Sequence, residues 1–392
     1  MWIFVLLSLT DAYIWFRLVT DLRQRNRWLK AVVFTVKAIF SLLLVYFIIR
    51  LLSYKDEFAD PANAFRYIAF GAMGALIITS GTLYLASSIM TRLTGRIFHR
   101  KLGGLVLINI IIPGAFILLF TDSYLRQRFN VKTVRQDITI SNLDSRLDGM
   151  KIVLISDLHL SSWYGHYDRL AGVVNSINAE KPDLLINTGD FITFGWQDFG
   201  RCDTILCKAR AVSRAYAISG NHDDGSYYPD DDESYNRECA AMLSDKITAS
   251  GYTLLSDTAV VISHNGALIS IAGVVTHGHH FKMSYGNFDK VFDMIPDSVF
   301  SVLLVHDPGA WEVAALDAGM PQLTLSGHTH GMQAGLPVPG GYISPAKLYY
   351  KHWKGLYTSD DKYLYVTTGL GTIGMALRIF MPPEIVVITL KQ

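Results

Sequence analysis

The first 120 residues contain long runs without charged side chains, separated by short loops. The runs at residues 67–91 and 102–121 hold no charged residue, and the run at 31–49 is interrupted only by Lys37. A helix needs about 20 apolar residues to cross the hydrocarbon core of a bilayer, where each backbone polar group must be satisfied within the helix. We therefore expect residues 1–121 to form an α-helical transmembrane bundle that contains these three runs.

Residues 2–18 form a further apolar run, but this run contains Asp11 and Arg17. Because an acid at the centre of a membrane costs about 2.5–3.5 kcal/mol, the run either spans the bilayer or lies at its surface. The segment has neither the basic start nor the small-residue cleavage site of a secretory signal peptide. We exclude that alternative.

Lys and Arg gather in the first and third loops of this segment, at residues 17–30 and 92–101, whereas the second loop is acidic. Basic loops indicate the cytoplasmic side of a membrane. Three crossings after the first loop then place the chain after residue 121 outside the cytoplasm, although a basic cluster at 126–135 favours the opposite side. The loop charges predict an integral, multi-pass membrane protein with an extracytoplasmic C-terminal domain.

The charge of the chain changes sign after the apolar segment. Residues 1–120 hold 13 basic and 5 acidic residues, against 22 and 29 in the remainder, and eleven of the twelve histidines lie in that remainder. The net charge of +1 offers no basic field for nucleic acid, which we exclude as a partner. We expect a linker and leading strand at 122–149 and a soluble domain at 150–392, and no feature of the sequence indicates a protein partner.

Five short apolar runs in the soluble domain each end in Asp, Asn or His. They are KIVLIS at 151–156, DLLIN at 183–187, AYAIS at 215–219, SVLLV at 301–305 and QLTLS at 322–326. Each run is typical of a buried strand. A single polar residue after a strand is usually a turn residue, but five strand ends on one edge of a sheet converge in space. The pattern predicts an α/β fold with a polar site at that edge.

The side chains that follow these runs are oxygen and imidazole donors without a thiolate. They are Asp157, His159, Asp190, Asn221, His306, His328 and His330. This mixture suits Mn, Fe, Zn or Co better than Ca or a structural zinc of the Cys type. Gly189, Gly220 and Gly327 are expected where the backbone turns sharply to aim the next side chain inward. No P-loop and no G-x-S-x-G motif competes for the site.

The order of these residues resembles the calcineurin-like metallophosphoesterase superfamily from about residue 150 to the end of the sequence. The matching blocks are Asp157-x-His159, Gly189-Asp190, Gly220-Asn221-His222-Asp223, His306 and Gly327-His328-x-His330. Further motifs resemble its membrane-attached branch, the transmembrane metallophosphoesterases: Ser156 to Leu160, Thr368 to Thr372, Arg378 and Pro382 to Ile385. The resemblance implies a four-layer α/β/β/α domain that binds two divalent metal ions.

The resemblance also implies a role for each residue of the blocks. Asp157, His159 and His330 would hold one metal, and Asn221, His306 and His328 the second, with Asp190 as the bridge. Such a metal pair, about 3.5–4 Å apart, clamps a phosphoryl group and lowers the pKa of a bound water, so a metal-bridging hydroxide would attack phosphorus in line. His222 would stabilise the developing charge or protonate the leaving oxygen, and Asp223 would hold the His222 imidazole in the productive tautomer.

The implied reaction is hydrolysis of a phosphodiester or pyrophosphate bond in a phosphorylated, lipid-linked or soluble small molecule at the membrane. The protein phosphatases of the superfamily continue the second block with a further Asp and an Arg, whereas Phe191 to Phe194 follow Asp190 here, which argues against a serine/threonine protein phosphatase. Two alternatives stay open. One is an enzyme of lipid A synthesis that acts on UDP-2,3-diacylglucosamine, which needs a cytoplasmic domain. The other is a non-catalytic metal-binding sensor or scaffold, against which the complete set of ligand positions and His222 argue.

Four other features have more than one interpretation. His277, His279 and His280 either line the substrate pocket or bind a stray metal. Cys202 and Cys207 either form a small disulfide or are a chance pair. The acidic run at 230–233 is expected to be a solvated insert, and the aromatic and basic stretch at 349–354 either meets lipid headgroups or substrate phosphate or consists of ordinary core and surface residues.

Overall fold

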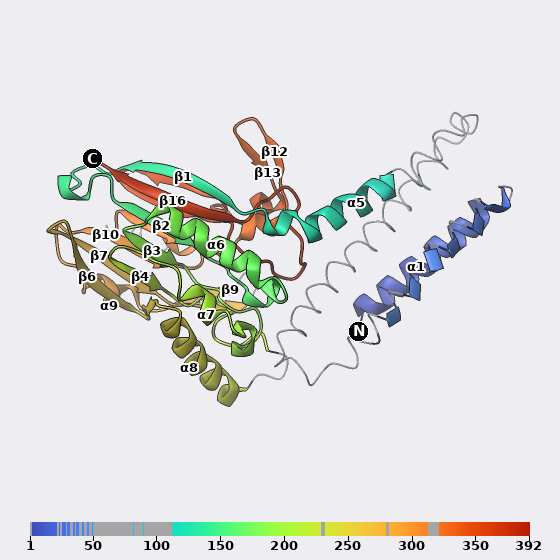
Figure 1. Ribbon diagram of the computed structural model, residues 1–392, viewed down its shortest axis with the longest axis horizontal. Helices are drawn as coiled ribbons and strands as arrows, with labels where there is room; N and C mark the ends of the chain where they lie inside the picture. Colours follow the sequence, from blue (N-terminus) through green and yellow to red (C-terminus); the bar gives the residue numbers. More distant parts are fainter. Residues whose placement is uncertain are drawn as a thin grey trace. The chain divides into compact units, whose positions relative to one another are not determined.

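The computed structural model describes residues 2–21, 112–228, 232–279, 282–312 and 321–392, together with scattered single residues between 23 and 89 (Figure 1). The chain divides into two compact units. The first consists of Met1–Glu57, Arg66–Leu125 and Gly374–Ala376, and the second of Phe58–Phe65, Arg126–Ile373 and Leu377–Gln392. The second unit carries the residues predicted to bind metal.

The first unit contains the helices α1 (Trp2–Asp21) and α5 (Ile112–Leu125). Among the residues that the structure describes, no helix combines the length and the apolar character needed to cross a bilayer. The run predicted at 67–91, except for Gly81 and Ile89, and about half of each of the runs at 31–49 and 102–121 lie outside the described residues.

Two of the charges that interrupt the apolar runs contact each other within the first unit. The Lys37 ammonium forms an ion pair with the Asp11 carboxylate, and the Ser41 hydroxyl donates to Asp11 Oδ2 at 2.7 Å. A lysine in such a run can extend its ammonium group towards the membrane surface. The structure instead pairs it with Asp11, which offsets the desolvation of both charges.

The second unit is built on two six-stranded sheets. The first has the order β1-β16-β2-β3-β4-β5 and the second the order β14-β15-β11-β10-β7-β6. The strands of the first sheet are β1 (Lys132–Thr139), β2 (Lys151–Ile155), β3 (Leu184–Asn187), β4 (Arg214–Ala217), β5 (Thr253–Leu254) and β16 (Glu384–Lys391). Those of the second are β6 (Thr258–His264), β7 (Ala267–Val274), β10 (Phe300–Val305), β11 (Leu323–Ser326), β14 (Gly355–Ser359) and β15 (Lys362–Val366).

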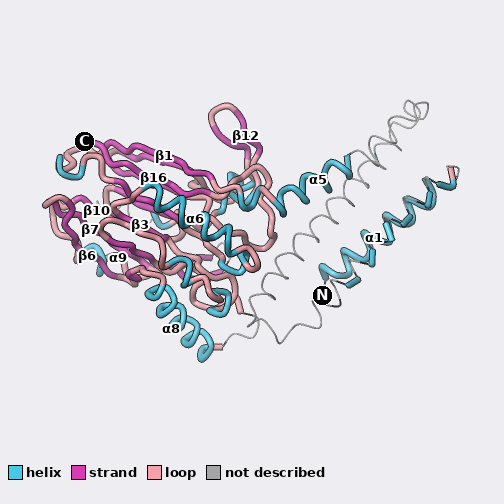
Figure 2. The backbone as a smooth tube through the Cα atoms, in the orientation of Figure 1, coloured by secondary structure: helices cyan, strands magenta, loops and turns pink. Residues whose placement is uncertain are grey.

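Two small hairpins and several helices complete this unit. The hairpins are β8 (Thr276–His279) with β9 (Lys282–Tyr285), and β12 (Leu336–Val338) with β13 (Gly341–Ile343). The α-helices are α6 (Tyr167–Glu180), α7 (Asp203–Leu206), α8 (Glu233–Ala249) and α9 (Phe288–Phe292). The 3-10 helices are η2 (Gln127–Phe129), η3 (Ser145–Leu147), η4 (Leu160–Trp163), η5 (Trp196–Phe199), η7 (His330–Gln333) and η8 (Pro345–Leu348). Figure 2 shows the β12–β13 hairpin projecting beyond the sheets.

Three hydrophobic clusters define the layers of the second unit. One lies between the two sheets and includes Ile152 and Val302. A second joins the outer face of the first sheet to α6, α7 and α8, where Val153 packs with Val173 of α6, and Figure 1 shows α6 running along this sheet. A third joins the second sheet to α9. The order of layers is therefore α/β/β/α, as the resemblance implied.

The predicted apolar runs form the central parallel strands of both sheets. Ile155 of β2, Asn187 of β3 and Ala217 of β4 are paired in one parallel register, and β10 pairs in parallel with β11. The side chains of β3, β10 and β11 are buried throughout, because helices or the facing sheet cover both sides of each strand. Their carboxyl ends therefore meet at one edge, where the polar residues follow.

Candidate metal centre

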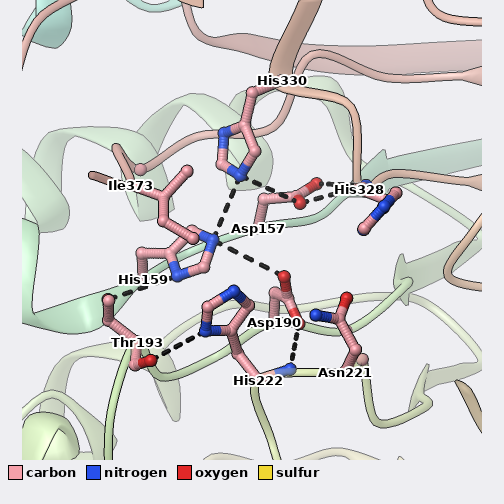
Figure 3. Close-up of polar contacts among 12 residues, drawn as sticks. Asp157, His159, Asp190, Thr193, Asn221, His222, His328, His330 and Ile373 are labelled. Atoms are coloured by element: carbon pink, nitrogen blue, oxygen red, sulfur yellow. Dashed lines mark hydrogen bonds and ion pairs between the residues drawn. The ribbon is translucent and has the colours of Figure 1, made fainter. Parts of the chain in front are cut away.

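The loops after β2 and β11 bring together one group of three metal-binding side chains. His159 Nε2 lies 3.1 Å from His330 Nε2, and His330 Nε2 lies 3.2 Å from Asp157 Oδ1 (Figure 3). All three side chains are buried, and one donor atom from each lies within 4.8 Å of the others. These are the three residues that the resemblance assigned to one metal.

A second group lies beside the first and contains Asp190, His306 and His328, again with one donor atom from each within 4.8 Å of the others. Asp190 Oδ2 is 3.1 Å from His306 Nε2 and 3.6 Å from His159 Nε2. Figure 3 shows the Asp190 carboxylate between His159 of the first group and Asn221. One carboxylate is thus within reach of both groups.

Two donor atoms at this place indicate that the centre fits divalent cations. Asn221 Oδ1 is buried and has no hydrogen-bond partner among the described residues, and His306 Nε2 is buried with only the Asp190 carboxylate beside it. The Asn221 amide nitrogen donates to the Tyr227 hydroxyl at 3.0 Å, which orients the carbonyl oxygen of the amide away from that contact. Buried polar atoms are rarely left without a partner, and a cation would satisfy both.

The backbone at the centre is strained at five of the seven predicted ligands. The φ angles are positive at Asp157 (51°), His159 (38°), Asp190 (57°), His328 (69°) and His330 (50°). Residues other than glycine rarely adopt this region, and such strain, which costs on the order of 1–3 kcal/mol per residue, gathers at functional sites. The strain turns the chain sharply after each strand and directs the side chains to a common point.

Comparison with known proteins agrees with this geometry. The sequence profile of the calcineurin-like phosphoesterases matches residues 150–332. The metallophosphoesterase YkuE of Bacillus subtilis is 34% identical over 268 residues, a region that covers 67% of this chain and 86% of that protein. The chain belongs to the calcineurin-like phosphoesterase family. It is therefore a metal-dependent phosphoesterase with two divalent metal ions as cofactors.

Two further relatives of this phosphoesterase carry more specific names. The transmembrane protein with metallophosphoesterase domain of Danio rerio is 27% identical and covers 67% of this chain and 57% of that protein. The UDP-2,3-diacylglucosamine pyrophosphatase LpxG of Chlamydia muridarum is 25% identical and covers 65% of this chain and 88% of that protein. Each of these two similarities extends over about two thirds of this chain.

The charges of the phosphoesterase site depend on burial and on close opposite charges. Burial raises the pKa of Asp157 to about 6 and lowers the pKa of His159 to about 3. Burial also opposes ionisation of Asp190 and His306, but their mutual attraction outweighs it, so the pKa of Asp190 falls well below its usual value and the pKa of His306 rises to about 10. A cation that binds here takes the place of the His306 proton, and we expect metal binding at neutral pH to release a proton.

Backbone carbonyls near the end of β3 orient three histidine rings. His306 Nδ1 lies 2.7 Å from Thr188 O, His159 Nδ1 lies 3.0 Å from Ile192 O, and His222 Nδ1 lies 2.7 Å from Thr193 O. A carbonyl oxygen can only accept, so each Nδ1 carries a proton, and Nε2 is the nitrogen that can serve as a donor atom for metal or face the substrate. The acceptors are backbone carbonyls, which leave no pattern in the amino-acid sequence, so these contacts could not be predicted from it.

The structure corrects the role that we expected for Asp223. Its carboxylate does not contact the His222 ring, whose Nδ1 is bound to Thr193 O. Instead it accepts the backbone N–H groups of Asp190, Phe191, Ile192 and Gly220 at 2.8–3.2 Å. The Asp223 side chain is directed towards the loop after β3, because that loop offers it consecutive backbone N–H donors. Asp223 therefore fixes the backbone that carries Asp190.

The three glycines of the motifs serve different purposes. Gly189 has a φ of +100° and makes the sharp turn that we expected, but Gly220 and Gly327 do not have a left-handed backbone. They are required for close approach instead: a Cβ atom on Gly220 would overlap the Asp190 carboxylate, and one on Gly327 would overlap Ser156 and the Asp157 carboxylate.

A buried guanidinium holds the loop after β15 against the first group of metal-binding residues. Arg378 is fully buried and donates to the carbonyls of Thr368 at 2.8 Å and Gly371 at 2.7 Å. The N–H of Gly371 in turn donates to Asp157 O at 2.7 Å. The motif residues near the end of the sequence thus support the backbone of Asp157.

We predict that Gly369→Ala lowers both stability and activity more than Gly165→Ala. Both glycines have left-handed backbones, with φ of +69° and +75°, but a Cβ on Gly369 would overlap the Asp157 side chain, whereas one on Gly165 meets open space. Each substitution incurs the cost of alanine at positive φ, about 1–2 kcal/mol. Gly369→Ala should cost a further 1–3 kcal/mol or so by overpacking, and displacement of Asp157 should lower the hydrolysis rate by about 10²-fold. Denaturant unfolding and phosphodiester hydrolysis of the full-length variants measure both effects, and equal losses would contradict the prediction.

We also predict that Asp198 makes the protein less stable as the pH rises. The side chain is 2% exposed, and burial raises its pKa to about 6, although the N–H groups of Thr193 and Phe194 donate to it. Between the unfolded value of 3.8 and about 6 the folded state keeps a proton that the unfolded state loses, so the free energy of unfolding falls with rising pH, by about 3 kcal/mol in total. Asp198→Asn has no such proton, so the wild type should lose this amount relative to the variant between pH 4 and 8. Denaturant unfolding of both proteins measures this difference. If the wild type and Asp198→Asn change in stability by the same amount between pH 4 and pH 8, the prediction is wrong.

The histidine patch, the two cysteines and the acidic run contribute no residue to the two metal-binding groups. His277 of β8 forms an ion pair with Asp224 at 3.5 Å and is 54% exposed, while the His279 side chain and His280 lie outside the described residues. Cys202 and Cys207 are free thiols, as is Cys239, so no disulfide joins them. In the acidic run, Asp232 caps α8 by accepting the N–H of Tyr235.

Proposed function

We propose that this chain is a membrane-anchored phosphoesterase that hydrolyses phosphodiester or pyrophosphate bonds at a centre of two divalent metals. Asp157, His159 and His330 would hold one metal, Asn221, His306 and His328 the second, and Asp190 would bridge them. The observation that carries this proposal is the position of Asp190 Oδ2, which lies 3.1 Å from His306 Nε2 and 3.6 Å from His159 Nε2. Two adjacent cations need a shared anion, and this oxygen is within reach of both groups.

The metals, once bound, supply Lewis-acid polarisation of the phosphoryl group and lower the pKa of a coordinated water. The chain itself supplies orientation. The Nδ1 contacts of His159 and His306 with backbone carbonyls leave Nε2 directed into the centre, and the His328 N–H donates to Asp157 Oδ1 at 3.0 Å. These contacts prevent the donor atoms from rotating away, which is the usual contribution of residues around metal ligands.

His222 is the residue that we propose to move a proton. It is 6% exposed, its Nδ1 is bound to Thr193 O, and its ring stacks on Tyr227 with the two centroids 3.8 Å apart. Burial lowers its pKa, which makes the imidazolium a stronger acid. In the imidazolium form, the Nε2–H would then donate its proton to the leaving oxygen, or a hydrogen bond to the charge that develops on the phosphoryl group.

The test of this function is hydrolysis of bis(p-nitrophenyl) phosphate by the purified full-length chain in detergent. We expect a chelator to abolish the reaction and Mn²⁺ to restore it, with Fe, Zn and Co compared under the same conditions. An intact, metal-loaded protein that hydrolyses neither this diester nor a pyrophosphate diester would refute the proposal.

We propose further that the runs at 31–49, 67–91 and 102–121 anchor the enzyme and that its catalytic domain lies outside the cytoplasm. The absence of charge in two of the runs and the basic loops at 17–30 and 92–101 support this topology. A pair of reporters fused after Gln392 tests it, since alkaline phosphatase is active only outside the cytoplasm and green fluorescent protein folds readily inside. Fluorescence without phosphatase activity would reverse the orientation.

A second candidate substrate follows from one relative. LpxG is named as a UDP-2,3-diacylglucosamine pyrophosphatase, and its similarity extends over 65% of this chain. A pyrophosphate substrate linked to lipid would suit an anchored site, but this nucleotide requires a cytoplasmic catalytic domain. Release of UMP from UDP-2,3-diacylglucosamine, together with a cytoplasmic result in the reporter experiment, would favour this candidate.

A further inference from the structure

A cavity of about 200 Å³ opens beside the second group of metal-binding residues. We call it the Asp307 pocket. Its lining includes Asp307, Glu312, Tyr349, Tyr350 and Lys351, together with His328 of the metal centre. A group esterified to a phosphate on the metals would enter this cavity directly.

Asp307 gives the pocket a buried negative charge. The residue is 7% exposed, and its carboxylate accepts the Tyr285 hydroxyl at 2.5 Å and the Gly309 N–H at 3.0 Å. It forms no ion pair with any Lys, Arg or His that the structure describes, and residues 313–320, which lie outside the described part, contain no basic residue. A buried carboxylate is usually stabilised by a cationic partner or several hydrogen bonds. Because Asp307 has no cationic partner among the described residues, its negative charge is available to a ligand.

The single cation of the pocket is already engaged. The Lys351 ammonium forms an ion pair with Glu312, so these two charges cancel and Asp307 leaves the pocket with a net negative charge. A second phosphate of a pyrophosphate substrate would therefore meet repulsion here. A positive group would be attracted.

The aromatic side chains of the pocket suit a substituted ammonium group. Tyr349 and Tyr350 line the cavity, and the Tyr350 ring packs against the His328 ring edge to face, with centroids 5.7 Å apart and an interplanar angle of 88°. Tyrosine rings attract ammonium groups through their negative faces, and quaternary ammonium ligands are commonly bound by aromatic rings together with carboxylates.

We propose that the Asp307 pocket binds the cationic amino-alcohol part of a phosphodiester substrate, of the choline or ethanolamine type. This inference rests on the proposed function and narrows it, because it favours a phosphodiester of an amino alcohol over a pyrophosphate. Lipid headgroups and water-soluble glycerophosphodiesters share this chemistry.

The test compares phosphocholine with 3,3-dimethylbutyl phosphate, its uncharged carbon analogue of equal shape. Calorimetric titration of the Mn²⁺-loaded full-length chain should show at least 10-fold tighter binding of phosphocholine. Asp307→Asn preserves the size of the side chain, its oxygen can still accept the Gly309 N–H, and its amide group can donate to the Tyr285 hydroxyl. In this variant the ratio of the two dissociation constants should fall to within about threefold. Asp360→Asn, at an exposed turn, is the matched control and should keep the wild-type ratio.

Equal binding of the two ligands by the wild type, or a preference that survives Asp307→Asn, would overturn the inference. Hydrolysis of bis(p-nitrophenyl) phosphate, measured on the same preparations, reports separately on the proposed function, because this diester carries no cation. Glycerophosphocholine and phosphatidylcholine vesicles, offered as separate substrates, then distinguish a soluble source of the headgroup from a lipid source.

Discussion

Asp190→Asn should lower kcat/KM for phosphodiester hydrolysis by about 10³-fold or more. Asparagine keeps the size of the side chain, tolerates the positive φ of 57° at this position and can still accept the His222 N–H, which lies 3.0 Å from Asp190 Oδ1. What it lacks is the negative charge shared by the two metal-binding groups. Loss of several kcal/mol of charge stabilisation corresponds to a factor of this size, since each 1.36 kcal/mol is tenfold in rate.

The same variant should also bind less metal, and elemental analysis of the purified protein measures this directly. Asp168→Asn is the control, because Asp168 lies in the first turn of α6 with 80% of its side chain exposed. It should keep full activity and full metal content. Retention of two metals and more than a tenth of the wild-type rate in Asp190→Asn would show that this carboxylate does not bridge the centre.

His222→Gln should lower kcat by about 10²–10⁴-fold while leaving two metals bound, because general acid–base groups contribute rate factors of this size. The glutamine amide can still donate to Thr193 O but cannot transfer a proton. We therefore expect His222→Gln to lose turnover and keep its metals. Substitution of a proposed metal ligand should instead lower both turnover and metal content.

The leaving group provides a second measurement on this variant. A diester with a good leaving group, such as p-nitrophenol, needs little protonation and should be affected less than an alkyl diester. His264→Gln on β6, outside the site, is the matched control. An equal loss for both diesters would exclude proton donation by His222 and leave stabilisation of the developing charge as its role.

The central strands and the residues after them could be predicted from the sequence because both depend on local pattern. KIVLI at β2 and LLIN at β3 are apolar on both faces, as a strand between two covering layers must be, and their ends are marked by Asp157 and Asp190. The convergence of these ends followed from the geometry of parallel strands. The comparisons with known proteins confirm the family to which this pattern pointed.

Other parts of the centre could not be predicted, because they depend on contacts between backbone groups far apart in sequence. His306 is oriented by the carbonyl of Thr188, 118 positions earlier, and a carbonyl has no signature in the sequence. The direction of the Asp223 side chain depends on which N–H groups the β3 loop exposes. Asp307 follows β10 outside the motifs of the sequence, and the cavity that it lines is visible only in the structure.

The last strand of the first sheet has a consequence for how the enzyme is made. β16 lies between β1 and β2, with Lys132 paired to Glu384 and Val153 paired to Val387. While the ribosome is still translating, the nascent chain already displays β1 and β2 with a gap between them, and their unpaired edges can attract other polypeptides. We therefore expect the metal-binding turn after β2 to reach its final geometry only once residues 384–391 are available to pair, and chaperones that shield strand edges to associate with the chain until then.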